Sequence, residues 1–116
     1  MEAIITETIK SYNQYMQKMP AGSMIISNLL REDRVTEALE NIRNFTEGVI
    51  WLIEVDNLVT QNGMSSELNI DKINEYLNEI NDGLTIQDYS LVADLFEYEI
   101  SPFFENVQQI SVQKQS

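Results

Sequence analysis

Apolar residues recur at steps of three and four along most of this chain, and the pattern is strongest over residues 35–61. One stripe of this segment consists of Ala38, Ile42, Phe45, Val49, Leu52 and Val59, with Leu39, Trp51 and Ile53 widening it. In its middle, residues 49–53 are all apolar, and they point all round a helix because successive residues differ by about 100°. Gly48 either marks a close approach of another helix or is a tolerated defect. The segment is predicted to be a long central helix that is covered on more than one side.

The part of the chain before this segment predicts two shorter helices. The seam of the first helix, over residues 2–18, runs through Ile5, Ile9, Tyr12, Met16 and Met19. Pro20 and Gly22 are expected to break this helix, because proline has no N–H to donate and glycine disfavours helix. Ser23 is then expected to cap a second helix over residues 24–31.

A loop is predicted after the central helix. Asn62 and Gly63 are expected to end that helix, because glycine enters the left-handed region without a steric penalty. The next helix is predicted to start near Asn69 or Asp71 and to end near Leu84. Its apolar residues again step by three and four while polar residues fill the other faces, so this is the most regular amphipathic segment of the chain.

The last helix is predicted over residues 89–110, with Asp88 as its N-terminal cap. Its buried side is expected to consist of Leu91, Val92, Leu95, Tyr98, Phe103 and Val107. Pro102 lies inside this pattern and predicts a kink near Ile100 and Ser101. The final residues, 111–116, have no apolar periodicity and are expected to fray.

Length and composition place all of these helices in one domain. A chain of 116 residues has room for a single core, and 43% hydrophobic residues are typical of a globular protein. The prediction is a single all-α domain over residues 1–110, a bundle of four to five mostly antiparallel helices. The chain has no Cys, which favours an intracellular, cytoplasmic setting, and neither a signal peptide nor a membrane-spanning apolar run is expected.

The chain carries a net charge of −12, and the excess lies in its C-terminal two thirds. Residues 1–43 carry six acidic and five basic side chains, whereas residues 44–116 carry thirteen acidic and two basic ones. Such a surface repels phosphate backbones and anionic lipid, so partners among nucleic acids and membranes are not expected. A basic protein partner fits this charge, although a negative surface also keeps a small bundle in solution.

The available side chains exclude most catalytic and metal-binding arrangements. With no His and no Cys, the chain cannot assemble a Ser-His-Asp or Cys-His set, and we expect no catalytic residue, no cofactor and no metal. Asp94 and Glu97 share a helix face and could hold a hard cation, but acids at this spacing usually form a solvated face. Asp94 lies among apolar residues, and if it is buried it needs a cation such as Arg31, Arg34 or Arg43 as its partner.

Aromatic residues near the end of the chain point to an interaction surface. Phe96, Phe103 and Phe104 cannot all share one helix face, so some apolar surface around them is either exposed or covered by a partner. A wide stripe that faces the core is the alternative. The residues expected to bind a partner are Trp51, Phe96, Phe103, Phe104, Glu97 and Glu99.

Two stretches, TEALENIRNFTEGVIWLIEV and DYSLVADLFEYEISPFFENV, resemble a family of small uncharacterised all-α proteins from Gram-positive bacteria. The residues that carry the resemblance are Gly48, Trp51 and Leu52 in the first stretch, and Asp88, Tyr89, Leu91, Asp94, Leu95, Glu97, Tyr98, Glu99 and Pro102 in the second. The resemblance covers residues 35–107 and implies a helical bundle without an established activity. Small acidic export chaperones of the flagellar type are similar in size and charge.

These patterns favour a non-enzymatic protein-interaction module, such as an adaptor or chaperone-like regulator, that binds a helical or basic segment of a partner protein. An acidic inhibitor that occupies the basic groove of a nucleic-acid-binding protein is the alternative. A homodimer is a further prediction, because the apolar middle of the central helix needs more cover than short neighbouring helices give.

Overall fold

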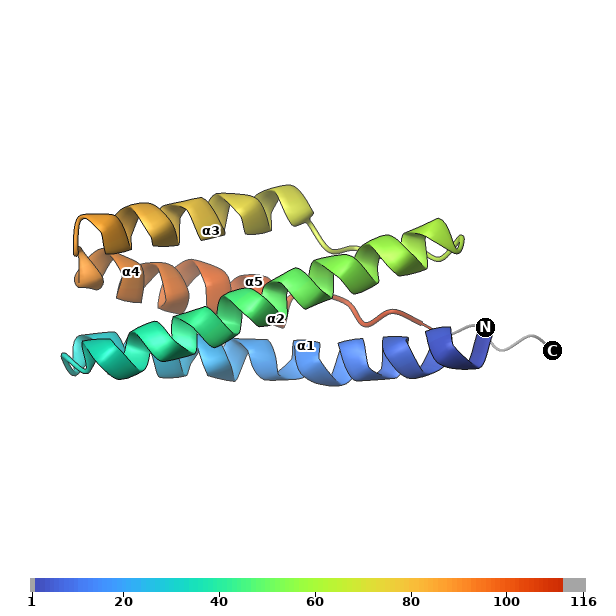
Figure 1. Ribbon diagram of the computed structural model, residues 1–116, viewed down its shortest axis with the longest axis horizontal. Coiled ribbons are helices and arrows are strands. Elements are labelled where there is room, and N and C mark those ends of the chain that lie inside the picture. The colour runs from blue at the N-terminus through green and yellow to red at the C-terminus, as the bar shows by residue number, and fades with distance from the viewer. Residues whose placement is uncertain (1, 112–116) are drawn as a thin grey trace.

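The computed structural model describes residues 2–111, which form an elongated all-α bundle with extents of 53 × 21 × 21 Å. Its helices are α1 (Glu2–Arg31), α2 (Val35–Gln61), α3 (Ile70–Thr85), α4 (Tyr89–Leu95) and α5 (Ser101–Glu105), with a π-helical turn η1 (Phe96–Ile100) between the last two. Figure 1 shows the α4–η1–α5 segment between α1 and α3, with α2 crossing the bundle diagonally. Helices α1, α2 and α3 and the α4–η1–α5 segment alternate in direction (Figure 1), so the predicted bundle of four to five mostly antiparallel helices is confirmed.

The first helix, α1, is continuous, and the prediction of a break at Pro20 and Gly22 is wrong. A proline inside a helix removes one backbone hydrogen bond and costs about 3 kcal/mol. The helix continues because residues on both sides of the proline bury one common face. The buried residues are Ile9, Tyr12, Met16 and Met19 before it, and Ser23, Ile26 and Leu30 after it. Ser23 is therefore no cap, and its hydroxyl donates to the Met19 carbonyl at 2.9 Å.

The long helix α2 has the predicted bounds, and its predicted stripe lies in the core. The members of the stripe, Ala38, Ile42, Phe45, Val49, Leu52 and Val59, are all buried. The middle of the helix is covered on one side more than on the other. Trp51 and Ile53 are partly buried against the core, whereas Ile50 is 49% exposed. The predicted homodimer, which would cover Ile50, stays a prediction.

Gly48 marks a close approach of two helices, which decides between the two interpretations of this glycine. A Cβ atom added at Gly48 would lie 2.6 Å from Cζ of Tyr15 on α1, and closer still to its hydroxyl oxygen. The Tyr15 ring also meets the ring of Trp51 edge to face, with 5.7 Å between the ring centroids. The absent side chain therefore makes room for an aromatic ring between α1 and α2.

Replacing Gly48 by Ala is expected to be about 1 kcal/mol less favourable than Gly22→Ala, because the added methyl group forces the Tyr15 ring to move and disturbs its contact with Trp51. Gly22→Ala is the matched control, since Gly22 also lies within a helix but has nothing within 4 Å of an added Cβ. That variant should gain up to about 1 kcal/mol from the better helix propensity of alanine. Urea denaturation of both variants measures the two effects, and equal gains in the two variants would contradict the close approach.

The connections use the predicted caps. The Asn69 side chain accepts a hydrogen bond from the Lys72 amide at 3.1 Å, and Asp88 accepts one from the Leu91 amide at 3.1 Å. Gly63, just after α2, has a φ of 79°, a conformation that is free of strain only for glycine. Gly63 therefore allows the turn that ends α2, and the two caps fix where α3 and α4 begin.

The last helix ends at Glu105, five residues before its predicted end. The chain after it is held by Asn13 on α1, whose carboxamide pairs with both backbone groups of Ile110. The Ile110 amide donates to Asn13 Oδ1 at 3.0 Å, and Asn13 Nδ2 donates to the Ile110 carbonyl at 3.0 Å. Ile110 is also buried, so burial in an extended conformation replaces further helix. Of the predicted frayed end, residues 112–116 lie outside the described residues.

Candidate functional site

The α4–η1–α5 segment buries every fourth residue. Val92, Phe96, Ile100 and Phe104 are all 0–3% exposed. In an ideal α-helix, residues four apart drift by about 40° at each step, so four of them would wind away from the core. The π-helical turn at Phe96–Ile100 is wider than an α-helical turn, and it keeps the four residues on one face.

The π-helical turn lies next to Pro102. The hydrogen bond that defines this turn joins residues five apart: the Ser101 amide donates to the Phe96 carbonyl. Pro102 itself has no N–H, and its ring would clash with the carbonyl four residues before it in a regular helix. A wider turn before the proline relieves this conflict, and the predicted kink near Ile100 and Ser101 takes this form.

The register of the segment exposes two apolar side chains that were predicted to be buried. Leu91 is 51% exposed and Tyr98 is 67% exposed. The prediction for these two residues is wrong, because the row of buried residues runs through Val92, Phe96 and Ile100, and the π-helical turn keeps this row on the core. The outer side of the segment therefore presents an aliphatic and an aromatic side chain seven residues apart, about two helical turns.

Two serines fix the segment to α1. The Ser27 hydroxyl donates to the Ala93 carbonyl at 3.0 Å, and the Ser101 hydroxyl donates to the Pro20 carbonyl at 3.3 Å. Ser27 and Ala93 are fully buried, and their small size lets the two backbones approach closely. The hydrogen bond to Pro20 ties the last segment to the middle of α1.

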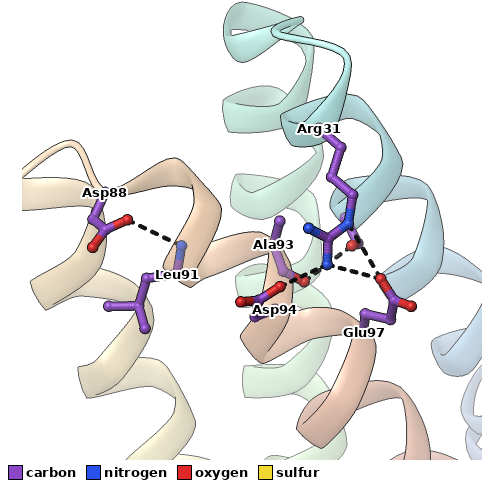
Figure 2. Close-up of polar contacts among 7 residues, drawn as sticks. Arg31, Asp88, Leu91, Ala93, Asp94 and Glu97 are labelled. Carbon is purple, nitrogen blue, oxygen red and sulfur yellow. Dashed lines mark hydrogen bonds and ion pairs between the residues drawn. The ribbon is translucent and has the colours of Figure 1, made fainter.

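Arg31, at the end of α1, holds two acids of the segment together (Figure 2). Its Nη2 atom lies 2.8 Å from Asp94 Oδ1 and 2.8 Å from Glu97 Oε1. The hydrogen bonds to Asp94 and Glu97 raise the pKa of the Arg31 guanidinium. The Asp94 side chain is 54% exposed, so the predicted ion pair exists, but it lies on the surface and not in the core. Such exposed pairs contribute little stability and serve mainly to orient the carboxylates.

The exposed side chains of the segment, which we together call the acidic face, combine carboxylates with apolar groups on more than one side of it. The acidic face consists of Leu91, Asp94, Glu97, Tyr98 and Glu99. Figure 2 shows Leu91 on the side of α4 away from Arg31, so its side chain is separate from the ion pairs. Around this face, residues 67–105 carry ten acidic side chains and one basic one, Lys72.

Lys72, the one basic residue among residues 67–105, already forms an ion pair within α3. Lys72 Nζ lies 3.1 Å from Glu75 Oε2 and 5.2 Å from the centroid of the Tyr76 ring. The hydrogen bond to Glu75 raises the pKa of Lys72, and burial raises the pKa of Tyr76. The negative charge of the region is therefore left largely uncompensated by the described side chains.

The residues predicted to bind a partner fall into three environments. Phe96 and Phe104 are buried and pack against Phe45 of α2, with ring centroids 5.1 and 6.1 Å apart. They belong to the core, which corrects the prediction of an exposed role for these two rings. Phe103 is partly buried beside Tyr76, at 5.5 Å between centroids.

The other three predicted residues remain accessible, but they are not together. Glu97 and Glu99 lie on the acidic face, whereas Trp51 lies on α2 beside Tyr15. Sequence reasoning missed Tyr98 as an exposed ring. The signal that identifies it is the spacing of four between Val92 and Phe96, which turns Tyr98 away from the core.

The described residues offer no metal site and no membrane helix. Within residues 2–111, no three carboxylate, imidazole or thiol side chains are grouped to hold a metal. Asp94 and Glu97, which could share a cation, instead share Arg31. None of the helices in this range is long and apolar enough to cross a membrane.

Comparison with known proteins places almost the whole chain in one family model. Residues 7–110 match a domain of unknown function (DUF8042). Neither the curated proteins nor the solved structures contain a match. The match includes α2 and the α4–η1–α5 segment, which carry the two stretches noted in the sequence.

Proposed function

We propose that this chain, which belongs to the DUF8042 family of domains of unknown function, is a non-enzymatic interaction module that binds a basic or helical segment of a partner protein. The observation that carries the proposal is the exposure of Leu91 and Tyr98 within a region of ten acidic residues and one basic residue. Apolar contacts supply affinity in such an interface, while charges guide the approach and select the partner. The partner segment would be basic with apolar residues on one side.

The architecture supports this role for the acidic face. Phe96 is buried beneath it, and the serine hydrogen bonds to α1 hold its backbone in place. A surface built on such a support loses little conformational entropy on binding. Arg31 orients the carboxylates of Asp94 and Glu97 before a partner arrives.

The proposal includes an intracellular setting in the cytoplasm, with the chain acting as an adaptor or chaperone-like regulator. Its support is the absence of cysteine, because a chain that forms no disulfides has no need of an oxidising compartment. The acidic residues disfavour nucleic acid and anionic membranes as direct partners, since both carry negative charge.

The test compares wild type with a Leu91→Asp/Tyr98→Asp double variant in a quantitative pull-down from native cytoplasm, followed by binding to the purified partner. We expect the double variant to bind about tenfold more weakly or worse, because interface affinity concentrates in a few apolar and aromatic contacts. Ile4→Asp is the control, since Ile4 is 67% exposed on α1, far along the chain from the acidic face. Equal binding by wild type and the folded double variant would contradict the proposal.

The salt dependence of the same binding distinguishes the alternative function. An acidic inhibitor of a nucleic-acid-binding protein would lose most of its affinity between low and high salt. Its binding would also be insensitive to loss of the Leu91 and Tyr98 side chains. A weak salt dependence together with sensitivity to the double variant supports the interaction module.

A further inference from the structure

A second surface, the aromatic groove between α1 and α2, lies apart from the acidic face. It has a volume of about 440 Å³ and is lined by Ser11, Tyr15, Asn44, Glu47, Gly48 and Trp51. The groove is shallow and open, since Ser11, Asn44 and Glu47 at its rim are exposed, so it suits one small group.

Two aromatic rings at nearly right angles build the groove. The Tyr15 and Trp51 rings are inclined by 79°, with 5.7 Å between their centroids. Both side chains are partly exposed, so each offers part of its ring to a ligand. Gly48 lets the tyrosine ring lie directly on the backbone of α2, which fixes the corner between the two rings.

The charge of the groove favours a cation. The faces of aromatic rings are negative because of their quadrupoles, and they attract cations that lie within about 6 Å of the ring centroid. Among the lining residues, only Glu47 carries a formal charge, and it is negative. Its nearest cation is Arg43, whose Nε atom lies 3.5 Å from Glu47 Oε1. Both side chains of this pair are well exposed, at 81% and 65%, so the pair is weak and open to exchange.

We propose that the aromatic groove binds an organic cation, an alkylammonium group held against Tyr15 and Trp51 and paired with the Glu47 carboxylate. The same chemistry is offered by a free quaternary ammonium compound and by the lysine side chain of a partner protein. Arg43 acts as an internal competitor for Glu47. This site is independent of the proposed role of the acidic face.

The test uses the fluorescence of Trp51, because the chain contains a single tryptophan. Tetramethylammonium chloride is titrated into the full-length protein, with sodium chloride at equal concentration as the reference. We expect a saturable change in Trp51 emission with a midpoint of roughly tens of millimolar, because the cation meets two rings and one carboxylate at an exposed site. A response equal to that of sodium chloride would overturn the proposal.

Three variants locate the response within the groove. Tyr15→Leu and Glu47→Gln should each raise the midpoint at least about threefold, because one wall or the charge is lost. Arg43→Gln should lower it, since Glu47 is then free. Glu47 and Arg43 are exposed, so both variants keep the fold and remain decisive even if Tyr15→Leu unfolds. An unchanged midpoint in Glu47→Gln and Arg43→Gln would also overturn the proposal.

The same titration identifies the source of the cation. A short peptide with a single lysine that binds more tightly than tetramethylammonium indicates a partner side chain, whereas the opposite order indicates a free quaternary ammonium compound. The Leu91→Asp/Tyr98→Asp variant should bind the cation as wild type does. Failure of the acidic-face experiment and failure of this one are thus distinguishable.

Discussion

Replacing Phe96 by Ala is expected to lower the free energy of unfolding by about 3–5 kcal/mol, the usual cost of removing a fully buried phenylalanine ring. Phe96 has no exposed surface, and its ring meets Phe45 of α2 edge to face at 5.1 Å. Its loss would leave a cavity where the π-helical turn and α2 pack together. Urea denaturation followed by circular dichroism measures the effect.

Tyr98→Ala is the matched control for this experiment, two residues further along the same turn. Tyr98 is 67% exposed, and substitutions at such positions usually change stability by less than about 0.5 kcal/mol. A large loss for Tyr98 with a small one for Phe96 would show that the buried side of the segment is the opposite one. In that case the acidic face would also be assigned wrongly.

A second large effect is expected in alkaline solution, where Tyr12 stabilises the folded state in a pH-dependent way. Burial raises the pKa of Tyr12 from 10.0 to about 12, the neighbouring Ser66 hydroxyl lowers it, and the Asp56 carboxylate raises it. Below pH 10, Tyr12 is protonated in both states and the contribution is fully present. Between pH 10 and 12 the unfolded chain releases this proton and the folded chain retains it, so stability falls as the pH rises.

The full effect of the Tyr12 shift amounts to roughly 2–3 kcal/mol, since one pKa unit corresponds to about 1.4 kcal/mol. Other groups of the chain also titrate in alkali, and Tyr12→Phe isolates this one. The variant should show a shallower loss of stability from pH 10 to 12 than wild type in urea denaturation. Parallel curves for the two proteins would contradict a buried, protonated Tyr12.

The two proposed sites lie on different parts of the molecule. The acidic face uses the C-terminal third of the chain, where negative charge and exposed apolar side chains coincide. The aromatic groove uses α1 and α2, where Gly48 brings two rings together. A module with both could bind a basic segment and, separately, an ammonium group, and each role can be removed without the other.

The features that the sequence predicted correctly depend on neighbouring residues. The bounds and buried stripe of α2 follow from a repeat of apolar residues that runs through the whole helix. The Asn69 and Asp88 side chains accept hydrogen bonds from amides only three residues away. Such caps form within one short segment, so the local sequence is enough to predict them. The same holds for Gly63, whose conformation serves the turn after α2.

The errors at the two prolines have an opposite cause. Pro20 is disfavoured in a helix because it has no N–H to donate. The helix continues because residues on both sides of the proline bury one common face. At Pro102 the chain adopts a π-helical turn, which rotates Tyr98 outward. The continuity of α1 and the side of the last segment that faces the core both depend on packing against other helices, such as the contact of Phe96 with Phe45 of α2.

The sequence by itself therefore determined the all-α class, the helices with an uninterrupted apolar repeat, their caps and the acidic C-terminal surface, because spacing and charge are local properties of the chain. Only the tertiary structure decided which rings are exposed, where Asp94 finds its cation and what Gly48 accommodates. Those features depend on which helices meet and in what rotation. The physical reason is that burial is a property of pairs of elements, and one helix's periodicity does not specify the partner that covers it.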